Sequence, residues 1–142
     1  MILEPLPKES QREIALIIRN IEKGTYRYYQ GDWHKGTECG TAHCIAGWKT
    51  VRDTAKKTKT SIGVVADTPP TNLSNLIKDT LLDISNWYDD EGAHAQRQWQ
   101  LTAHEAARLF SVEQTLDGMK EMLSHWANNE RLVFDEWVKV ID

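Results

Sequence analysis

The fold depends on one stretch of sequence, Cys39-Gly40-Thr41-Ala42-His43-Cys44-Ile45-Ala46-Gly47-Trp48. Thr41 is a residue type that caps helix N-termini, because its hydroxyl accepts a hydrogen bond from a free backbone N–H group. Four residues then follow at the spacing of one helix face: Cys44, Trp48, Val51 and Ala55. The pattern predicts a helix over about residues 42–56, with Cys44 in its first turn and its apolar face packed at the centre of the fold.

The sequence before this stretch predicts one further helix. Ser10 and Glu13 have the spacing of a capping box, in which each side chain accepts from the backbone N–H of the other residue. Four isoleucines then repeat at helical spacing: Ile14, Ile17, Ile18 and Ile21. Gly24 is a typical C-terminal stop, so we expect this helix to begin near Ser10 and end at Gly24.

The sequence after the stretch predicts a long helix that ends in an acidic turn. Apolar residues at helical spacing extend from Asn72 to Tyr88, and Asp89-Asp90-Glu91-Gly92 closes that helix. This turn places three carboxylates beside Trp87 and His94, but it lacks the spacing of a calcium-binding loop. We therefore interpret it as a solvated helix end.

Two more capping-box patterns follow: Thr102 with Glu105, and Ser111 with Gln114. The first predicts a short helix, and the second a longer helix from Val112 to Asn128-Asn129. A last apolar stripe predicts a terminal helix: Phe134, Trp137, Val138 and Ile141. We therefore predict an all-α fold, a single compact bundle of five to six helices in which residues 1–142 form one domain.

The composition is typical of a soluble globular domain and disfavours two classes of partner. Apolar residues make up 40% of the 142 residues and charged residues 27%, well away from the composition of disordered chains. The net charge is −4, so the molecule as a whole does not attract phosphates, and we expect no nucleic-acid partner. No segment approaches the roughly eighteen apolar residues of a membrane span, and no secretion signal is recognisable. With only two cysteines, the chain is expected in the cytoplasm, without a membrane partner.

The leading interpretation of the Cys39–Trp48 stretch is structural. Gly40 permits a sharp turn, Thr41 caps the helix and Cys44 is a small buried apolar residue. Ala46-Gly47 offer a flat surface for close packing of another helix. This interpretation accounts for every residue of the stretch except Cys39 and His43.

A second interpretation gives the same stretch a reactive thiol. Cys44 near a helix N-terminus lies at the positive end of the helix dipole, and His43 is its neighbour. A helix dipole lowers the pKa of a thiol, and a neighbouring imidazole that contacts the sulfur does the same, so Cys44 becomes a candidate nucleophile or redox sensor with His43 assisting and Cys39 as the resolving thiol. Apart from this alternative, the sequence predicts no catalytic residue.

A third interpretation is a zinc site. The ligand types that tetrahedral zinc prefers all occur here: His34, Cys39, His43 and Cys44. The four residues nevertheless lie within eleven positions, whereas structural zinc sites usually join two separated pairs of ligands. The adjacent His43 and Cys44 also point in different directions on a helix. We therefore predict no metal site and no cofactor.

The stretch also resembles a family of short, uncharacterised helical proteins of bacteria and phages. These proteins carry the motif C-G-T-x-x-C-x-A-G-W, followed further along the chain by a segment that ends in Leu-Phe. Here the second segment is 101–110, which ends in Leu109-Phe110. The resemblance covers about twenty residues and implies a helical fold, but no activity.

The function that fits these observations is a non-enzymatic interaction module. The chain is rich in tryptophan and tyrosine, and such side chains dominate the binding energy of many interfaces. We expect a surface that pairs with a second copy or with another protein, formed by these aromatic residues: Tyr26, Tyr28, Tyr29, Trp33 and Trp87. The motif adds further candidate binding residues: Cys39, Thr41, His43, Cys44 and Trp48. The alternative is a thiol-dependent or redox-sensing protein that uses Cys44 with Cys39.

Overall fold

The computed structural model describes residues 3–26, 44–68, 70–81, 87–111 and 113–140. These residues form seven helices and one two-stranded hairpin. The elements are α1 (Lys8–Glu22), α2 (Ile45–Thr58), α3 (Ile62–Ala66), α4 (Pro70–Thr80), α5 (Trp87–Trp99), α6 (Ala103–Leu109), α7 (Leu116–Ala127), β1 (Glu130–Val133) and β2 (Glu136–Lys139). The predicted helical fold is confirmed in its main feature, since the structure is mostly helical, but it has seven helices in the described ranges rather than five to six and adds a small C-terminal hairpin.

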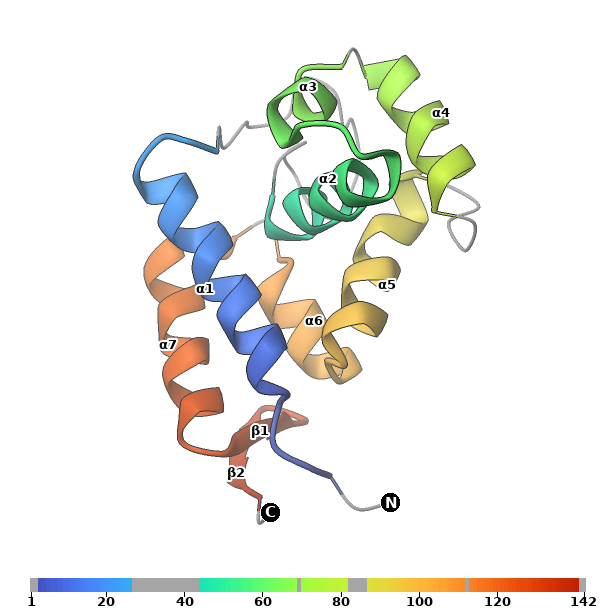
Figure 1. Cartoon of the computed structure of the whole chain (residues 1–142). Coiled ribbons are helices and arrows are strands. Elements are labelled where there is room, and N and C mark those ends of the chain that lie inside the picture. Colours follow the sequence, from blue (N-terminus) through green and yellow to red (C-terminus); the bar gives the residue numbers. More distant parts are fainter. Residues whose placement is uncertain (1–2, 27–43, 69, 82–86, 112, 141–142) are drawn as a thin grey trace.

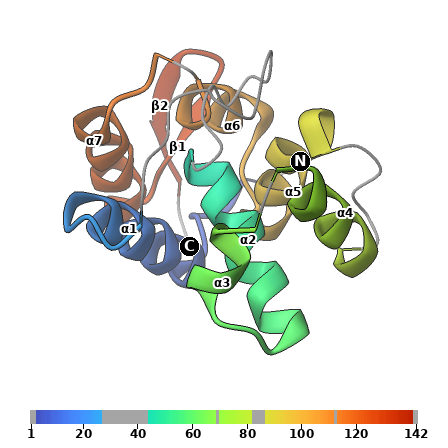
Figure 2. The same ribbon diagram turned by 90° about the horizontal axis from the view of Figure 1, so that it is seen from above.

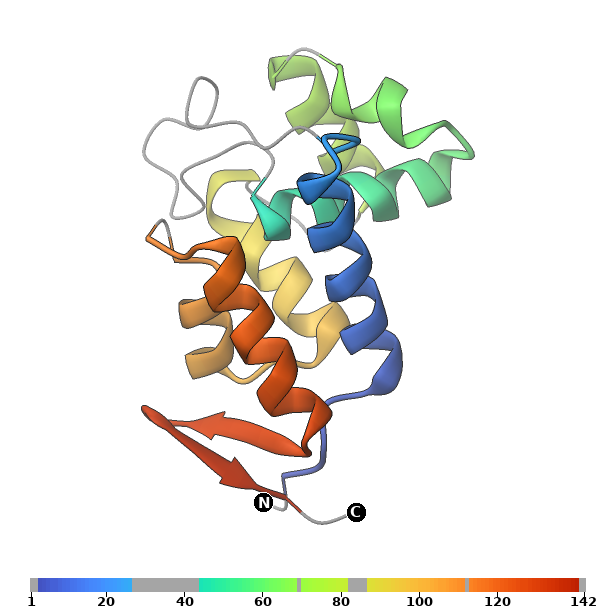
Figure 3. The same ribbon diagram turned by 90° about the vertical axis from the view of Figure 1, so that its left-hand side faces the viewer.

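The helices are arranged in two groups that meet at α2. Helices α1 and α7 lie side by side, with α5 and α6 next to them, and the hairpin crosses one end of this group (Figures 1 and 3). Helices α2, α3 and α4 cover the opposite end, and α2 lies between α1 and α5 when the molecule is seen from above (Figure 2). Within the described ranges, no helix combines the length and the apolar character that crossing a membrane requires.

Helix α2 occupies the central position that the sequence predicts. It contacts α1, α3, α4 and α5. Its first three turns are buried almost all round, and the buried residues are Ile45, Ala46, Gly47, Trp48, Lys49, Thr50, Val51, Thr54 and Ala55. The hydroxyls of Thr50 and Thr54 donate to the carbonyls four residues earlier, so they remain satisfied in this apolar setting.

The start of α2 corrects one prediction. Cys44, not Thr41, is the N-cap: its Sγ accepts a hydrogen bond from the Gly47 N–H at 3.4 Å, and the helix begins at Ile45. Cys44 is buried, so little water reaches this helix end. A weakly polar sulfur satisfies one free amide there while remaining apolar enough for the core.

A β-hairpin replaces the predicted terminal helix. Strand β1 pairs antiparallel with β2, so that Leu132 faces Trp137. The Trp137 ring stacks on His125 with centroids 4.3 Å apart, whereas Phe134 at the turn has a φ of 56° and is exposed. The apolar residues 134, 137 and 138 fit helical spacing, but the hairpin instead buries Leu132 and the neighbouring Arg131, which have partners in the core.

The acidic turn predicted to end one helix is the beginning of another. Helix α4 ends at Thr80, and residues 89–92 lie inside α5, which begins at Trp87. Carboxylates in the first turns of a helix interact favourably with the positive end of its dipole, so this sequence supports a helix start as well as a helix end. Helix α4 begins at Pro70. Proline suits the first position of a helix, because the N–H that it lacks would have no partner within the first turn.

Some of the predicted caps and stops are confirmed, and others are not. The Thr102 and Glu105 capping box is present at α6. Gly24 and Asn129 both take the left-handed conformation that ends a helix, with φ values of 79° and 59°. Helix α7, however, begins at Leu116 with Thr115 as its N-cap, rather than at Val112.

Glu105 joins the hairpin to the helices. Its side chain is fully buried and accepts both Nε and Nη2 of Arg131, at 2.9 and 2.8 Å, and the indole N–H of Trp126 at 2.8 Å. It also accepts the backbone N–H groups of Thr102 and Leu132. A buried carboxylate is stable only when its oxygens are paired in this way.

We therefore expect Glu105→Ala to lower the free energy of unfolding by about 3–5 kcal/mol, because the variant leaves the Arg131 charge buried without its partner. Urea unfolding followed by tryptophan fluorescence measures this loss. The matched control is Glu113→Ala, which truncates an exposed carboxylate and should change the stability by less than about 0.5 kcal/mol. Equal effects of the two substitutions would contradict the assignment.

Candidate functional site

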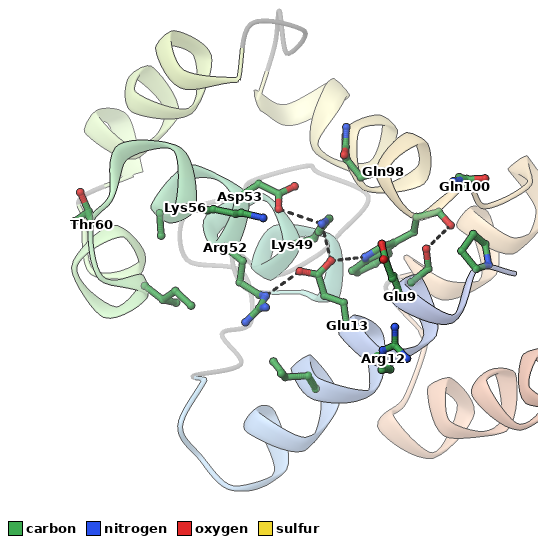
Figure 4. Close-up of a pocket in the computed structure, with 16 residues that line it drawn as sticks. Glu9, Arg12, Glu13, Lys49, Arg52, Asp53, Lys56, Thr60, Gln98 and Gln100 are labelled. Carbon is green, nitrogen blue, oxygen red and sulfur yellow. Dashed lines mark hydrogen bonds and ion pairs between the residues drawn. The ribbon is translucent and has the colours of Figure 1, made fainter.

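A cleft of about 770 Å³ lies between α1, α2 and the C-terminal end of α5, with the start of α3 at one side (Figure 4). It is open to solvent, and its lining is unusually rich in charge. Four lining residues are cationic and three are anionic: Arg12, Lys49, Arg52 and Lys56, and Glu9, Glu13 and Asp53. We call Glu13, Lys49, Arg52, Asp53 and Trp99 the floor of the cleft, and Glu9, Arg12 and Lys56 its rim.

The Glu13 carboxylate is the centre of the floor. Oε1 accepts hydrogen bonds from Lys49 Nζ at 2.5 Å and from the Trp99 indole N–H at 2.8 Å. Oε2 accepts from Arg52 Nε at 3.1 Å. One side chain of α1 is thereby bound to two side chains of α2 and to the last residue of α5, as the dashed lines in Figure 4 show.

Asp53 extends this network toward the interior. Its carboxylate accepts from Lys49 Nζ at 3.0 Å, and its other oxygen lies 2.8 Å from Nε2 of the buried His94. The Lys49 ammonium thus lies between two carboxylates and balances part of their charge. No three His, Cys, Asp or Glu side chains of the described residues gather as a metal site.

The network lowers the pKa of both floor carboxylates. Burial alone raises the pKa of Glu13, but the hydrogen bonds from Lys49, Trp99 and Arg52 outweigh it and hold the pKa below its ordinary value of 4.5. Burial likewise opposes ionisation of Asp53, and the bonds to His94 and Lys49 reverse that effect. Both groups are therefore anionic at neutral pH, and the floor is a fixed pattern of opposite charges.

The floor is also connected to the predicted motif. Arg52 Nη1 donates to the Tyr26 hydroxyl at 2.7 Å, and the Tyr26 ring stacks on Trp48 with centroids 4.2 Å apart. Tyr26 and Trp48 are both buried, so neither belongs to the exposed aromatic surface or binding surface that the sequence suggested. Tyr26 instead holds the Arg52 guanidinium through its hydroxyl, and Trp48 holds the Tyr26 ring by stacking on it.

The structure gives Ser10 and Glu13 a role that their capping-box spacing did not predict. Helix α1 begins at Lys8 with Pro7 as the N-cap, and no side chain caps it. The Ser10 hydroxyl instead donates to the Trp99 carbonyl at 2.9 Å, while Glu13 binds the Trp99 indole. Both residues of the supposed box therefore attach α1 to the end of α5.

The rim differs from the floor because its cations have no partner among the residues that the structure describes. Arg12 and Lys56 are exposed, and their side chains make no hydrogen bond or ion pair with any residue in the described ranges. Arg52 uses Nε and Nη1 in the floor, and within the same ranges its Nη2 donates to no residue. Three cationic groups are thus available to a ligand.

Several predicted site residues cannot be placed in relation to this cleft. Tyr28, Tyr29, Trp33, His34, Cys39, Thr41 and His43 lie outside the described residues, as does the side chain of Trp87. Cys44 is a free, buried thiol at the start of α2. The proposed zinc ligands and the Cys39–Cys44 pair therefore remain predictions.

The sequence does carry a signal for the cleft, and we did not predict the cleft from it. Charged residues of α2 repeat at helical spacing on the face opposite the apolar one: Lys49, Arg52, Asp53 and Lys56. A matching charged stripe occurs on α1: Glu9, Arg12 and Glu13. A charged stripe usually faces solvent, and only the packing of α1 against α2 turns these two stripes toward each other.

Removing the central carboxylate tests this network. We expect Glu13→Gln to lower the free energy of unfolding at pH 7 by about 1–3 kcal/mol, because Lys49 and Arg52 lose a charged acceptor. A carboxyl with a depressed pKa stabilises the fold above its unfolded-state pKa, and this contribution disappears as the pH falls through the folded-state pKa. The difference between wild type and variant should therefore narrow below about pH 4, as measured by urea unfolding across the pH range.

Glu9→Gln is the matched control for that measurement. Glu9 is an exposed carboxylate on the same helix and the same cleft, and its replacement should change stability by less than about 0.5 kcal/mol. A loss for Glu13→Gln that stays constant down to pH 3 would show that the charge of Glu13 is not what matters.

The buried thiol gives a separate prediction. In a Cys39→Ser variant, which leaves Cys44 as the single thiol, we expect iodoacetamide to react at least about tenfold more slowly than in the same variant unfolded in urea. Burial under the first turn of α2 protects the sulfur until the helix opens. Rapid alkylation of the folded variant near neutral pH would contradict this and would favour the reactive-thiol interpretation.

No family assignment follows from comparison with known proteins. A scan against protein-family models found no match, and neither did searches of the curated proteins and of the solved structures. The resemblance of the motif to bacterial and phage proteins therefore stays a prediction from the sequence. The function has to be argued from the site itself.

Proposed function

We propose that this chain is a small cytoplasmic interaction module without catalytic activity, which binds a segment of a partner protein in the cleft between α1, α2 and α5. One observation carries the proposal: a fixed, internally paired set of charges forms the floor, and the rim carries cations that have no partner among the described residues. Such a site recognises a ligand without having to reorganise.

The construction of the cleft favours binding by a preformed surface. The floor groups come from three packed helices and hold one another in place, so little side-chain entropy is lost when a ligand enters. The lining also includes the apolar residues Leu16 and Ile62 beside the amides of Gln98 and Gln100. An open groove with mixed apolar and polar walls suits an extended peptide better than an enclosed small molecule.

The state of the floor groups supports binding rather than chemistry. General acid–base catalysis needs a group that exchanges a proton with the substrate. In the described part of the cleft, the carboxylates of Glu13 and Asp53 are held ionised by Lys49 and their other partners, and the Ser10 hydroxyl is buried and donates to a backbone carbonyl. Each of these groups already has a structural task.

A thiol-dependent function that uses Cys44 with Cys39 is the second candidate. It is favoured by the position of Cys44 Sγ at the N-terminus of α2, where the sulfur accepts a hydrogen bond from the Gly47 N–H. The burial of that sulfur opposes it. The alkylation measurement described above separates the two candidates.

The binding proposal is tested by selecting peptides from a random library displayed on phage. We expect wild-type protein to enrich peptides that bind with a Kd of roughly 1–100 μM and shift the NMR resonance of the Trp99 indole N–H, because this group lies in the floor. That resonance is assigned from a Trp99→Phe variant. The library makes no assumption about the charge of the peptide.

Two substitutions locate the binding. Gln98→Trp places a bulky side chain on the wall of the cleft and should weaken the selected peptides at least about tenfold. Lys57→Trp, on an exposed position of α2 outside the cleft, is the control and should leave the affinity unchanged. If no peptide is enriched, or if Gln98→Trp binds as tightly as wild type, the proposed function is wrong.

A further inference from the structure

We infer that the segment bound in the cleft is an acidic, extended peptide whose carboxylates are held by Arg12, Lys56 and the free edge of Arg52. This inference rests on the proposed function and names the chemistry of the partner segment. It follows from three features of the cleft: its charge, the state of its cations and their positions.

The charge of the cleft is opposite to that of the whole chain. In the floor, the cations Lys49 and Arg52 balance the carboxylates of Glu13 and Asp53. The charge that remains comes from the rim, where two cations stand against one carboxylate. A protein with a net charge of −4 therefore presents a cationic opening at this one cleft, which attracts anionic ligands and guides their approach.

The cations of the opening are ready to bind. Arg12 and Lys56 make no ion pair with any described residue, so no contact with this part of the chain has to break before they accept a ligand. Arg52 is different because its guanidinium is fixed in orientation by Glu13 and the Tyr26 hydroxyl. Its Nη2 edge is consequently a preorganised donor for a carboxylate, which is the group that a guanidinium binds with the best geometry.

The positions of the cations indicate an extended ligand. In Figure 4, Lys56 and Arg12 lie on opposite sides of the paired Glu13 and Lys49, rather than together at one point. A single phosphate on one side would not reach the cation on the other side. Separate carboxylates along one peptide reach both sides.

The neutral lining residues complete the match with a peptide. Leu16 and Ile62, which also line the cleft, offer apolar contacts, and Gln98 and Gln100 offer amide groups to a peptide backbone. The expected ligand therefore alternates acidic and apolar side chains. Arg12 and Lys56 select the charge, and the apolar residues contribute area.

Three fluorescent octapeptides test the inference: alternating Asp and Leu, alternating Asn and Leu, and alternating Lys and Leu. Fluorescence anisotropy at about 50 mM salt should give the Asp peptide at least about tenfold tighter binding than the other two, with a loss of affinity at about 500 mM salt. The Asp peptide should also shift the Trp99 indole N–H resonance. Equal binding of the three peptides overturns the inference.

Substitutions at the rim identify the groups responsible. The double variant Arg12→Gln with Lys56→Gln should weaken the Asp peptide at least about tenfold, and Glu9→Gln, which removes the rim carboxylate, should strengthen it about twofold. Lys57→Gln is the control, because it removes an equally exposed cation outside the cleft. All these positions are on the surface, so circular dichroism and urea unfolding should show an unchanged fold.

The outcomes separate this inference from the proposed function. If library peptides bind the cleft but are not acidic, or if the Asp peptide ignores the rim substitutions, the acidic preference is wrong and the binding function stands. If neither the library nor the octapeptides bind, the binding function fails as well. Self-association detected by sizing at several concentrations, blocked by Gln98→Trp, would show a second copy in place of the acidic peptide.

Discussion

The carboxylate of Glu13 accepts hydrogen bonds from α2 and from the end of α5 while its own backbone belongs to α1. Taking such a group out of water is unfavourable unless each oxygen is paired, and here Lys49, Arg52 and Trp99 do so together. The geometry of these three donors fixes how α1, α2 and α5 approach one another. The cleft exists only between helices held at that separation, so the proposed binding site depends on this one carboxylate.

A second carboxylate performs the same task at the other end of the molecule with a different consequence. Glu105 binds Arg131 and Trp126 and so fixes the hairpin to α6 and α7. Its side chain is fully buried, whereas that of Glu13 keeps 20% of its surface exposed. The Glu105 network is therefore purely structural, while the Glu13 network also forms a surface that a ligand can reach.

Helix α2 combines both properties on its two faces. Trp48, Val51 and Ala55 fill the core, and on the other side Lys49, Arg52 and Asp53 face the cleft. The stacking of Tyr26 on Trp48 connects the faces, because the Tyr26 hydroxyl holds the Arg52 guanidinium. The packed core therefore fixes the orientation of Arg52, which is the preorganised cation of the proposed binding site.

The sequence by itself determined the features that depend on neighbours a few residues away: the helical character, the central apolar helix, the capping box at Thr102 and the stops at Gly24 and Asn129. Where a local pattern was compatible with two structures, long-range contacts decided which of the two forms. The spacing of Ser10 and Glu13 fits a cap equally well as a tertiary contact, and their actual partner, Trp99, is 86 positions from Glu13. Residues 134–138 fit a helix, but they form the turn and second strand of a hairpin whose first strand carries the buried Arg131 to Glu105. The cleft belongs to this second class, because charged stripes on two helices become a site only when long-range packing makes them face each other.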